Sequence, residues 1–78
     1  MSRGVIRSES TRGYWFVEDH ESHRSFFVHH SQVADERFLH VGDIVQFEIV
    51  PNPVRHDQQM AGSVRYIGRV GVAEAVRR

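Results

Sequence analysis

Residues 14–29, YWFVEDHESHRSFFVH, contain two short apolar runs separated by a polar stretch. The runs YWFV at 14–17 and FFVH at 26–29 are rich in aromatic and β-branched residues, which favour β-strands. The stretch between them, residues 18–25, holds only charged, hydroxyl and histidine side chains. This arrangement predicts two strands joined by a loop.

Both predicted strands are apolar on their two faces. In the first strand Trp15 and Val17 share one face, because successive side chains alternate across a strand. Phe26 and Val28 share the corresponding face of the second strand. We expect these two pairs to fill the core, because a barrel this small has room for only one set. The opposite faces then carry an exposed patch made of Tyr14, Phe16, Phe27 and His29.

An exposed apolar patch of this kind indicates an interaction site. Aromatic rings beside arginines form a platform on which unpaired bases stack. The alternative is that a second layer, the C-terminal segment or a dimer partner covers the same rings. The residue pattern leaves both interpretations open.

Three further strands are predicted outside this region, at residues 4–7, 44–50 and 60–67. The alternation in 44–50 places Val45, Phe47 and Ile49 on one face. Pro51 and Pro53 end that strand, because proline cannot donate a hydrogen bond to a sheet ladder. Several short strands with turn signals between them predict an all-β barrel or sandwich.

The composition limits the class of protein. The chain has 78 residues, a length that predicts a single domain. We expect this domain over residues 1–68, followed by a C-terminal tail over 69–78. The chain has no cysteine, so no disulfide or thiolate zinc site is predicted. All ten of its basic Lys-or-Arg positions are arginine, and the ten acidic residues balance them. We predict a cytoplasmic protein without a membrane partner, because the N-terminal residues lack a signal-peptide pattern and no apolar run approaches membrane-spanning length.

Five segments, in order and at similar spacing, resemble the cold-shock domain family. RGYWFV at 12–17 is similar to its first ribonucleoprotein motif, KGFGFI, and FFVHHS at 26–31 is similar to its second, VFVHFS. Segments 4–7, 42–49 and 61–64 also match. The resemblance covers residues 3 to about 67. It implies a five-stranded antiparallel OB-type barrel that binds single-stranded RNA or DNA on its second and third strands.

Site residues follow from the resemblance by position. It implies that Tyr14, Phe16 and Phe27 stack on bases and that His29 stacks or forms hydrogen bonds. It also implies that His30 takes the place of a further aromatic residue and that Phe38 supplies a loop ring. Arg12 takes the place of a backbone-contacting lysine, and Arg7 is a second candidate for phosphate contact. The predicted nucleic-acid-binding residues are therefore Arg7, Arg12, Tyr14, Phe16, Phe27, His29, His30 and Phe38.

The chain departs from the family pattern at three places. At the end of the predicted strand 4–7, the chain carries Ser8 and Glu9 where bacterial members have a Trp-Phe pair. Residues 57–60 lack the family's Gly-Pro. Trp15 stands where the first motif has its second glycine. Because Trp15 is in phase with Val17, we expect its indole to be buried.

The predicted function is a single-strand-binding module that acts as an RNA chaperone or as a regulator of transcription or translation. The alternative is an OB-type protein-interaction module or a homodimer, formed through the aromatic patch or the C-terminal tail. Catalysis is not expected, because the chain has no nucleophile motif and no glycine-rich phosphate loop. No cofactor or metal is predicted either, because nothing in the spacing of the six histidines makes them converge.

Overall fold

The computed structural model describes residues 1–69. It contains the strands β1 (Ser2–Ser10), β2 (Tyr14–Asp19), β3 (Ser25–His29), β4 (Asp43–Pro51) and β5 (Gln59–Arg69), and the short 3-10 helices η1 (His30–Gln32) and η2 (Ala34–Glu36). The predicted tail begins at Arg69, which is the last residue of β5; residues 70–78 lie outside the described residues.

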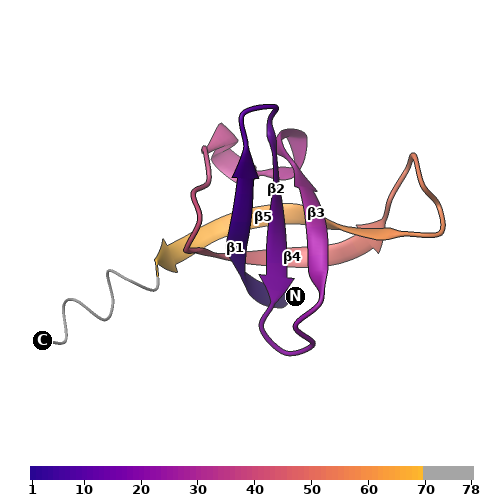
Figure 1. Cartoon of the computed structure of the whole chain (residues 1–78), viewed down its shortest axis with the longest axis horizontal. Helices are drawn as coiled ribbons and strands as arrows, with labels where there is room; N and C mark the ends of the chain where they lie inside the picture. Colours follow the sequence, from indigo (N-terminus) through magenta and orange to yellow (C-terminus); the bar gives the residue numbers. More distant parts are fainter. Residues whose placement is uncertain (70–78) are drawn as a thin grey trace, which may run out of the picture.

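The five strands close into a barrel in the order β1-β2-β3-β5-β4. Figure 1 shows β1, β2 and β3 side by side, with β4 and β5 crossing behind them. The prediction of an all-β, five-stranded OB-type barrel is confirmed.

The prediction that the barrel is antiparallel throughout is wrong at one contact. β3 and β5 pair in parallel, with Phe27 opposite Met60 and Val28 opposite Ala61. The other four neighbouring pairs are antiparallel. The reason is geometric: strand directions cannot alternate around a closed ring with an odd number of members, so one pair must run in parallel.

β1 is longer than the sequence predicts. The ladder with β2 continues through Ser8, Glu9 and Ser10, after an irregularity between Ile6 and Ser8 that leaves Arg7 as an extra residue. A bulge of this kind lets the strand bend around the barrel while the polar residues beyond it stay paired. The turn to β2 uses Gly13 at a positive φ of 86°, which glycine adopts without strain.

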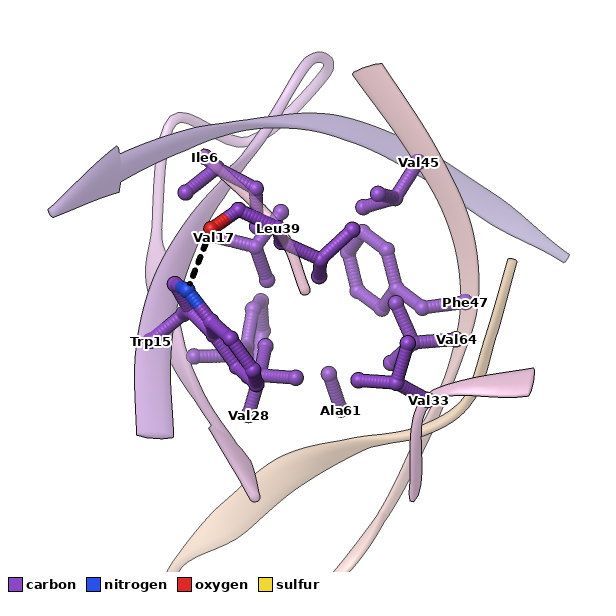
Figure 2. Close-up of a cluster of buried hydrophobic side chains, with 11 residues drawn as sticks. Ile6, Trp15, Val17, Val28, Val33, Leu39, Val45, Phe47, Ala61 and Val64 are labelled. Carbon is purple, nitrogen blue, oxygen red and sulfur yellow. Dashed lines mark hydrogen bonds between the residues drawn. The ribbon is translucent and has the colours of Figure 1, made fainter. Parts of the chain in front are cut away.

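The interior of the barrel is one apolar cluster. It consists of Ile6, Trp15, Val17, Phe26, Val28, Val33, Leu39, Val45, Phe47, Ala61 and Val64, with Tyr66 packed against it. Figure 2 shows the side chains of ten of these residues directed toward a common centre. Trp15 is only 2% exposed, so the prediction that it is buried is confirmed.

Trp15 also joins two parts of the chain. Its Nε1 donates a hydrogen bond of 2.8 Å to the carbonyl oxygen of Leu39, which is itself fully buried (Figure 2). The indole therefore connects β2 to the segment between η2 and β4. The neighbouring Phe38 packs against it, with ring centroids 5.4 Å apart at an interplanar angle of 73°.

The buried part of this face of β4 ends at Phe47. Val45 and Phe47 are fully buried, as expected, but Ile49, the next residue in the same alternation, is 39% exposed. The register shift between Gln46 and Glu48 places the extra residue in β5, because Gln46 pairs with Arg65 and Glu48 pairs with Gly62. The alternation of β4 itself is therefore unbroken, and Ile49 lies beyond the part of the face that the core covers.

A buried carboxylate organises the loop between β2 and β3. Asp19 accepts hydrogen bonds from the backbone N–H of Ser22 (3.1 Å) and from its hydroxyl (2.7 Å). These bonds, the hydroxyl bond first, lower the pKa of the Asp19 carboxyl from its ordinary value of 3.8. Hydrogen bonds to the charged form favour ionisation, and here they outweigh the opposing effect of burial.

Asp19→Asn should therefore change how stability depends on pH. Because the folded-state pKa of Asp19 lies below its unfolded value, its contribution is complete above about pH 4 and is lost as pH falls through the folded-state pKa. We expect the wild type to be more stable than Asp19→Asn at neutral pH, with the difference shrinking under acid. Thermal melts across this range measure it, and a difference that does not vary with pH would contradict the assignment.

Candidate nucleic-acid interface

Four side chains form one aromatic surface on the outside of the barrel, here called the aromatic face: Tyr14 and Phe16 of β2, and Phe27 and His29 of β3. The antiparallel register places Phe16 opposite Phe27 and Tyr14 opposite His29. The ring centroids of Tyr14 and Phe27 are 5.4 Å apart, and that of Phe16 lies 6.0 Å and 5.9 Å from them. The register therefore makes the three rings mutual neighbours.

The predicted phase of both strands is correct. Phe16 is 39% exposed, and the other three residues of the aromatic face are half-buried. Their chain neighbours Trp15, Val17, Phe26 and Val28 are all buried in the core. The aromatic face is therefore available for contact and is not needed to fill the barrel.

The two consecutive histidines are held in defined positions at the end of β3. Nδ1 of His29 accepts a hydrogen bond from the backbone N–H of Ser31 (3.2 Å) and lies 2.8 Å from its hydroxyl oxygen. The His30 ring lies 4.3 Å from that of His29, centroid to centroid. A Cβ atom at Gly13 would approach Cδ2 of His30 to 2.8 Å. Glycine at position 13 thus leaves room for His30 to extend the aromatic face.

Phe38 belongs to a different part of the surface. Its side chain is 53% exposed and packs on Trp15 and His40. It lines a hollow together with His30 and Arg37. Within the described residues, no ring of the aromatic face contacts Phe38. The structure therefore places Phe38 beside His30, at one end of the predicted site.

The two predicted arginines occupy different positions. Arg12 is exposed in the turn between β1 and β2, next to the Tyr14 end of the face. Arg7 is the bulged residue of β1, and its Nε lies 3.2 Å from Oε1 of Glu18. Arg7 is therefore already engaged in an ion pair within the protein.

Glu18 bridges two basic groups. Its Oε2 lies 3.0 Å from Nδ1 of His23, in addition to the contact with Arg7. The hydrogen bond with His23, followed by the hydrogen bond and charge of Arg7, lowers the pKa of the Glu18 carboxyl against the opposing effect of burial. Glu18 is therefore ionised at neutral pH.

One segment of the surface was missed from the sequence. Residues 50–54, at the end of β4 and the start of the β4–β5 loop, line a hollow together with Phe27 and His29. Val54 in this loop is 87% exposed. The parallel contact between β3 and β5 places residues 50–54 beside Phe27 and His29. No local sequence signal predicts this position.

Comparison with known proteins adds no identification. No model of a known family and no curated protein matches the chain.

Among the described residues, no three His, Asp or Glu side chains gather as a metal-binding group. The helices in residues 1–69 are too short and too polar for any of them to cross a membrane. Because no family model and no curated protein matches, the cold-shock resemblance stays a prediction based on motif segments.

Proposed function

We propose that this protein is a non-catalytic, cold-shock-like module that binds single-stranded RNA or DNA. The observation that carries the proposal is the aromatic face on β2 and β3 of an OB-type barrel. Stacking of one base on an aromatic side chain contributes about 1–3 kcal/mol. The rings of Tyr14, Phe16 and Phe27, whose centroids lie 5.4–6.0 Å apart, offer stacking surface for consecutive bases.

The histidines and arginines suit the same ligand. His29 and His30 present flat rings with polar nitrogens, which stack on bases or form hydrogen bonds with their edges. Arg12 stands at the end of the face, where its guanidinium can bind a phosphate. Stacking is tolerant of base identity, because every base has a π-face. We therefore expect broad sequence tolerance.

Such a surface favours unpaired strands. In a duplex each base is stacked between its neighbours and cannot lie on a protein ring. Binding therefore shifts the equilibrium of a hairpin toward its open form. We propose on this basis that the protein acts as an RNA chaperone, or as a regulator of transcription or translation, in the cytoplasm.

Titration of labelled oligothymidine, an unstructured RNA and a stable duplex tests the proposal. We expect binding to both single strands and much weaker binding to the duplex. Affinity for single strands should fall as salt rises, with a slope of about 0.7 logarithmic units per phosphate contact, and we expect only a few contacts because the net charge is zero.

Two outcomes would contradict the proposal. Affinity that does not respond to salt would exclude contact with the phosphate backbone. Failure to bind either single strand, together with a dimer in analytical ultracentrifugation, would favour the alternative of a protein-interaction module or homodimer that covers the aromatic face.

A further inference from the structure

A basic hollow adjoins the aromatic face. Glu18 follows Phe16 on the same outward side of β2, two residues along the strand. The hollow around it, here called the basic pocket, is lined by Arg3, Gly4, Val5, Arg7, Glu18, His20, His23 and Ile44. Four of these residues carry basic groups and one carries a carboxylate, so the pocket is net positive even when both histidines are neutral.

The fold holds the basic groups in place. Val5 is opposite Glu18 in the β1–β2 ladder, and the bulge at Arg7 directs this residue beside the same carboxylate. The backbone N–H of His20 donates a 2.8 Å hydrogen bond to the carbonyl oxygen of Arg3. This bond ties the β2–β3 loop to β1, so the two histidines of the loop lie beside the two arginines of the strand.

His23 occupies an unusual backbone conformation. Its φ is 60°, in the left-handed region that glycine adopts freely and other residues adopt at a cost. The N–H of His23 donates to the carbonyl oxygen of Asp19 at 2.9 Å, which closes the turn. A glycine would satisfy this backbone equally well. The histidine side chain adds the contact between its Nδ1 and Glu18.

The contacts of Glu18 resemble those of a bound anion. One carboxylate oxygen faces Arg7 and the other faces His23. A phosphodiester also presents two anionic oxygens, and arginine and protonated histidine are good donors to them. Glu18 therefore holds the two basic groups in the arrangement that a phosphate would use.

We propose that the basic pocket binds a backbone phosphate of the strand that stacks on the aromatic face, and that Glu18 competes with this phosphate for Arg7 and His23. The inference rests on the proposed single-strand binding. It extends the predicted site from the aromatic rings to Arg3, His20 and His23.

Glu18→Gln tests the competition, because it keeps the shape of the side chain and removes its charge. We expect affinity for oligothymidine to rise about twofold to fivefold, since exposed charge pairs are worth little more than this. The salt dependence should steepen by at most about 0.7 logarithmic units, because the phosphate contact in the pocket becomes complete once Glu18 no longer competes for it. Glu48→Gln is the matched control, because Glu48 is exposed on β4 outside both surfaces and its replacement changes the net charge equally. Equal effects of the two substitutions would overturn the proposal.

His23→Gly tests the histidine without threatening the fold, because glycine suits the backbone at position 23. The charged groups that face His23 in the pocket are Arg3, Arg7, Glu18 and His20, while β4 contributes only the apolar Ile44. The variant removes one of the two basic groups that contact Glu18. We expect its affinity for oligothymidine to be about twofold to fivefold lower than that of the wild type, because the phosphate loses one donor and Glu18 loses one partner.

An affinity of His23→Gly equal to that of the wild type would overturn the proposal. The two proposals fail separately. If Phe27→Ala weakens binding while Glu18→Gln matches Glu48→Gln and His23→Gly matches the wild type, only the basic pocket is wrong. If the wild type binds no single strand at all, the proposed function is wrong and the pocket proposal is wrong with it.

Discussion

Phe26→Ala is expected to destabilise the protein by about 3–5 kcal/mol, the range measured for removal of a buried aromatic ring. The Phe26 side chain is 2% exposed, lies 5.9 Å from the ring of Phe47, and is covered by the guanidinium of Arg24 at 5.1 Å. Small domains have a total stability of about 0.05–0.15 kcal/mol per residue. For a 78-residue chain this is about 4–12 kcal/mol in total, so the loss removes a large part of the stability and the variant should melt well below the wild type.

Phe27→Ala is the internal control for this prediction. The two phenylalanines are chain neighbours on opposite faces of β3, and Phe27 lies on the aromatic face. We expect this variant to melt close to the wild type and to bind oligothymidine more weakly by about 1–3 kcal/mol, the contribution of one stacked base. If the protein unfolded on loss of Phe27 but not of Phe26, the assignment of the two faces would be wrong. If Phe27→Ala folded and bound normally, the aromatic face would not be a base platform.

Trp15→Ala should have an effect of similar size, a loss of about 3–5 kcal/mol. The substitution removes the largest side chain of the core and leaves the buried carbonyl of Leu39 without its donor. Trp15→Phe separates these two effects. It keeps an aromatic ring in the barrel but removes the indole N–H, so we expect a smaller loss of about 1–3 kcal/mol, as for other buried groups left unsatisfied.

Thermal melts followed by circular dichroism measure both variants. Trp15 is the only tryptophan, so the intrinsic fluorescence of the wild type reports on the core directly. A blue-shifted emission is expected for the folded protein, with a red shift on unfolding. A wild-type melting temperature for Trp15→Ala would show that the indole is not a core residue, contrary to its 2% exposure.

Much of the fold could be predicted because its signals are local. The alternation of side chains across a strand assigned Trp15 and Phe26 to the core and Tyr14 and Phe27 to the surface. The structure confirms all four assignments. The same alternation did not predict the exposure of Ile49, because the extent to which a strand is covered depends on what packs against it and not on its own residues.

The surface beyond the aromatic rings could not be predicted, because it combines distant segments. His20 and His23 lie in the polar stretch between the two apolar runs, and both are exposed in the structure. Both line the basic pocket, because the β2–β3 loop folds back toward β1 through the hydrogen bond between His20 and Arg3. Glu18 belongs to the same polar stretch, and in the structure it holds Arg7, a predicted phosphate contact, in an ion pair.

The sequence by itself determined what depends on one strand at a time: the positions of most strands, the side chains that face inward, and the presence of an exposed aromatic surface. The tertiary structure alone decided how strands far apart in the chain meet. Closing an odd number of strands made β3 and β5 parallel and brought residues 50–54 beside the aromatic face. The burial of Trp15 joined β2 to Leu39 across the barrel. Local preference is encoded in neighbouring residues, whereas barrel closure is a property of all five strands together.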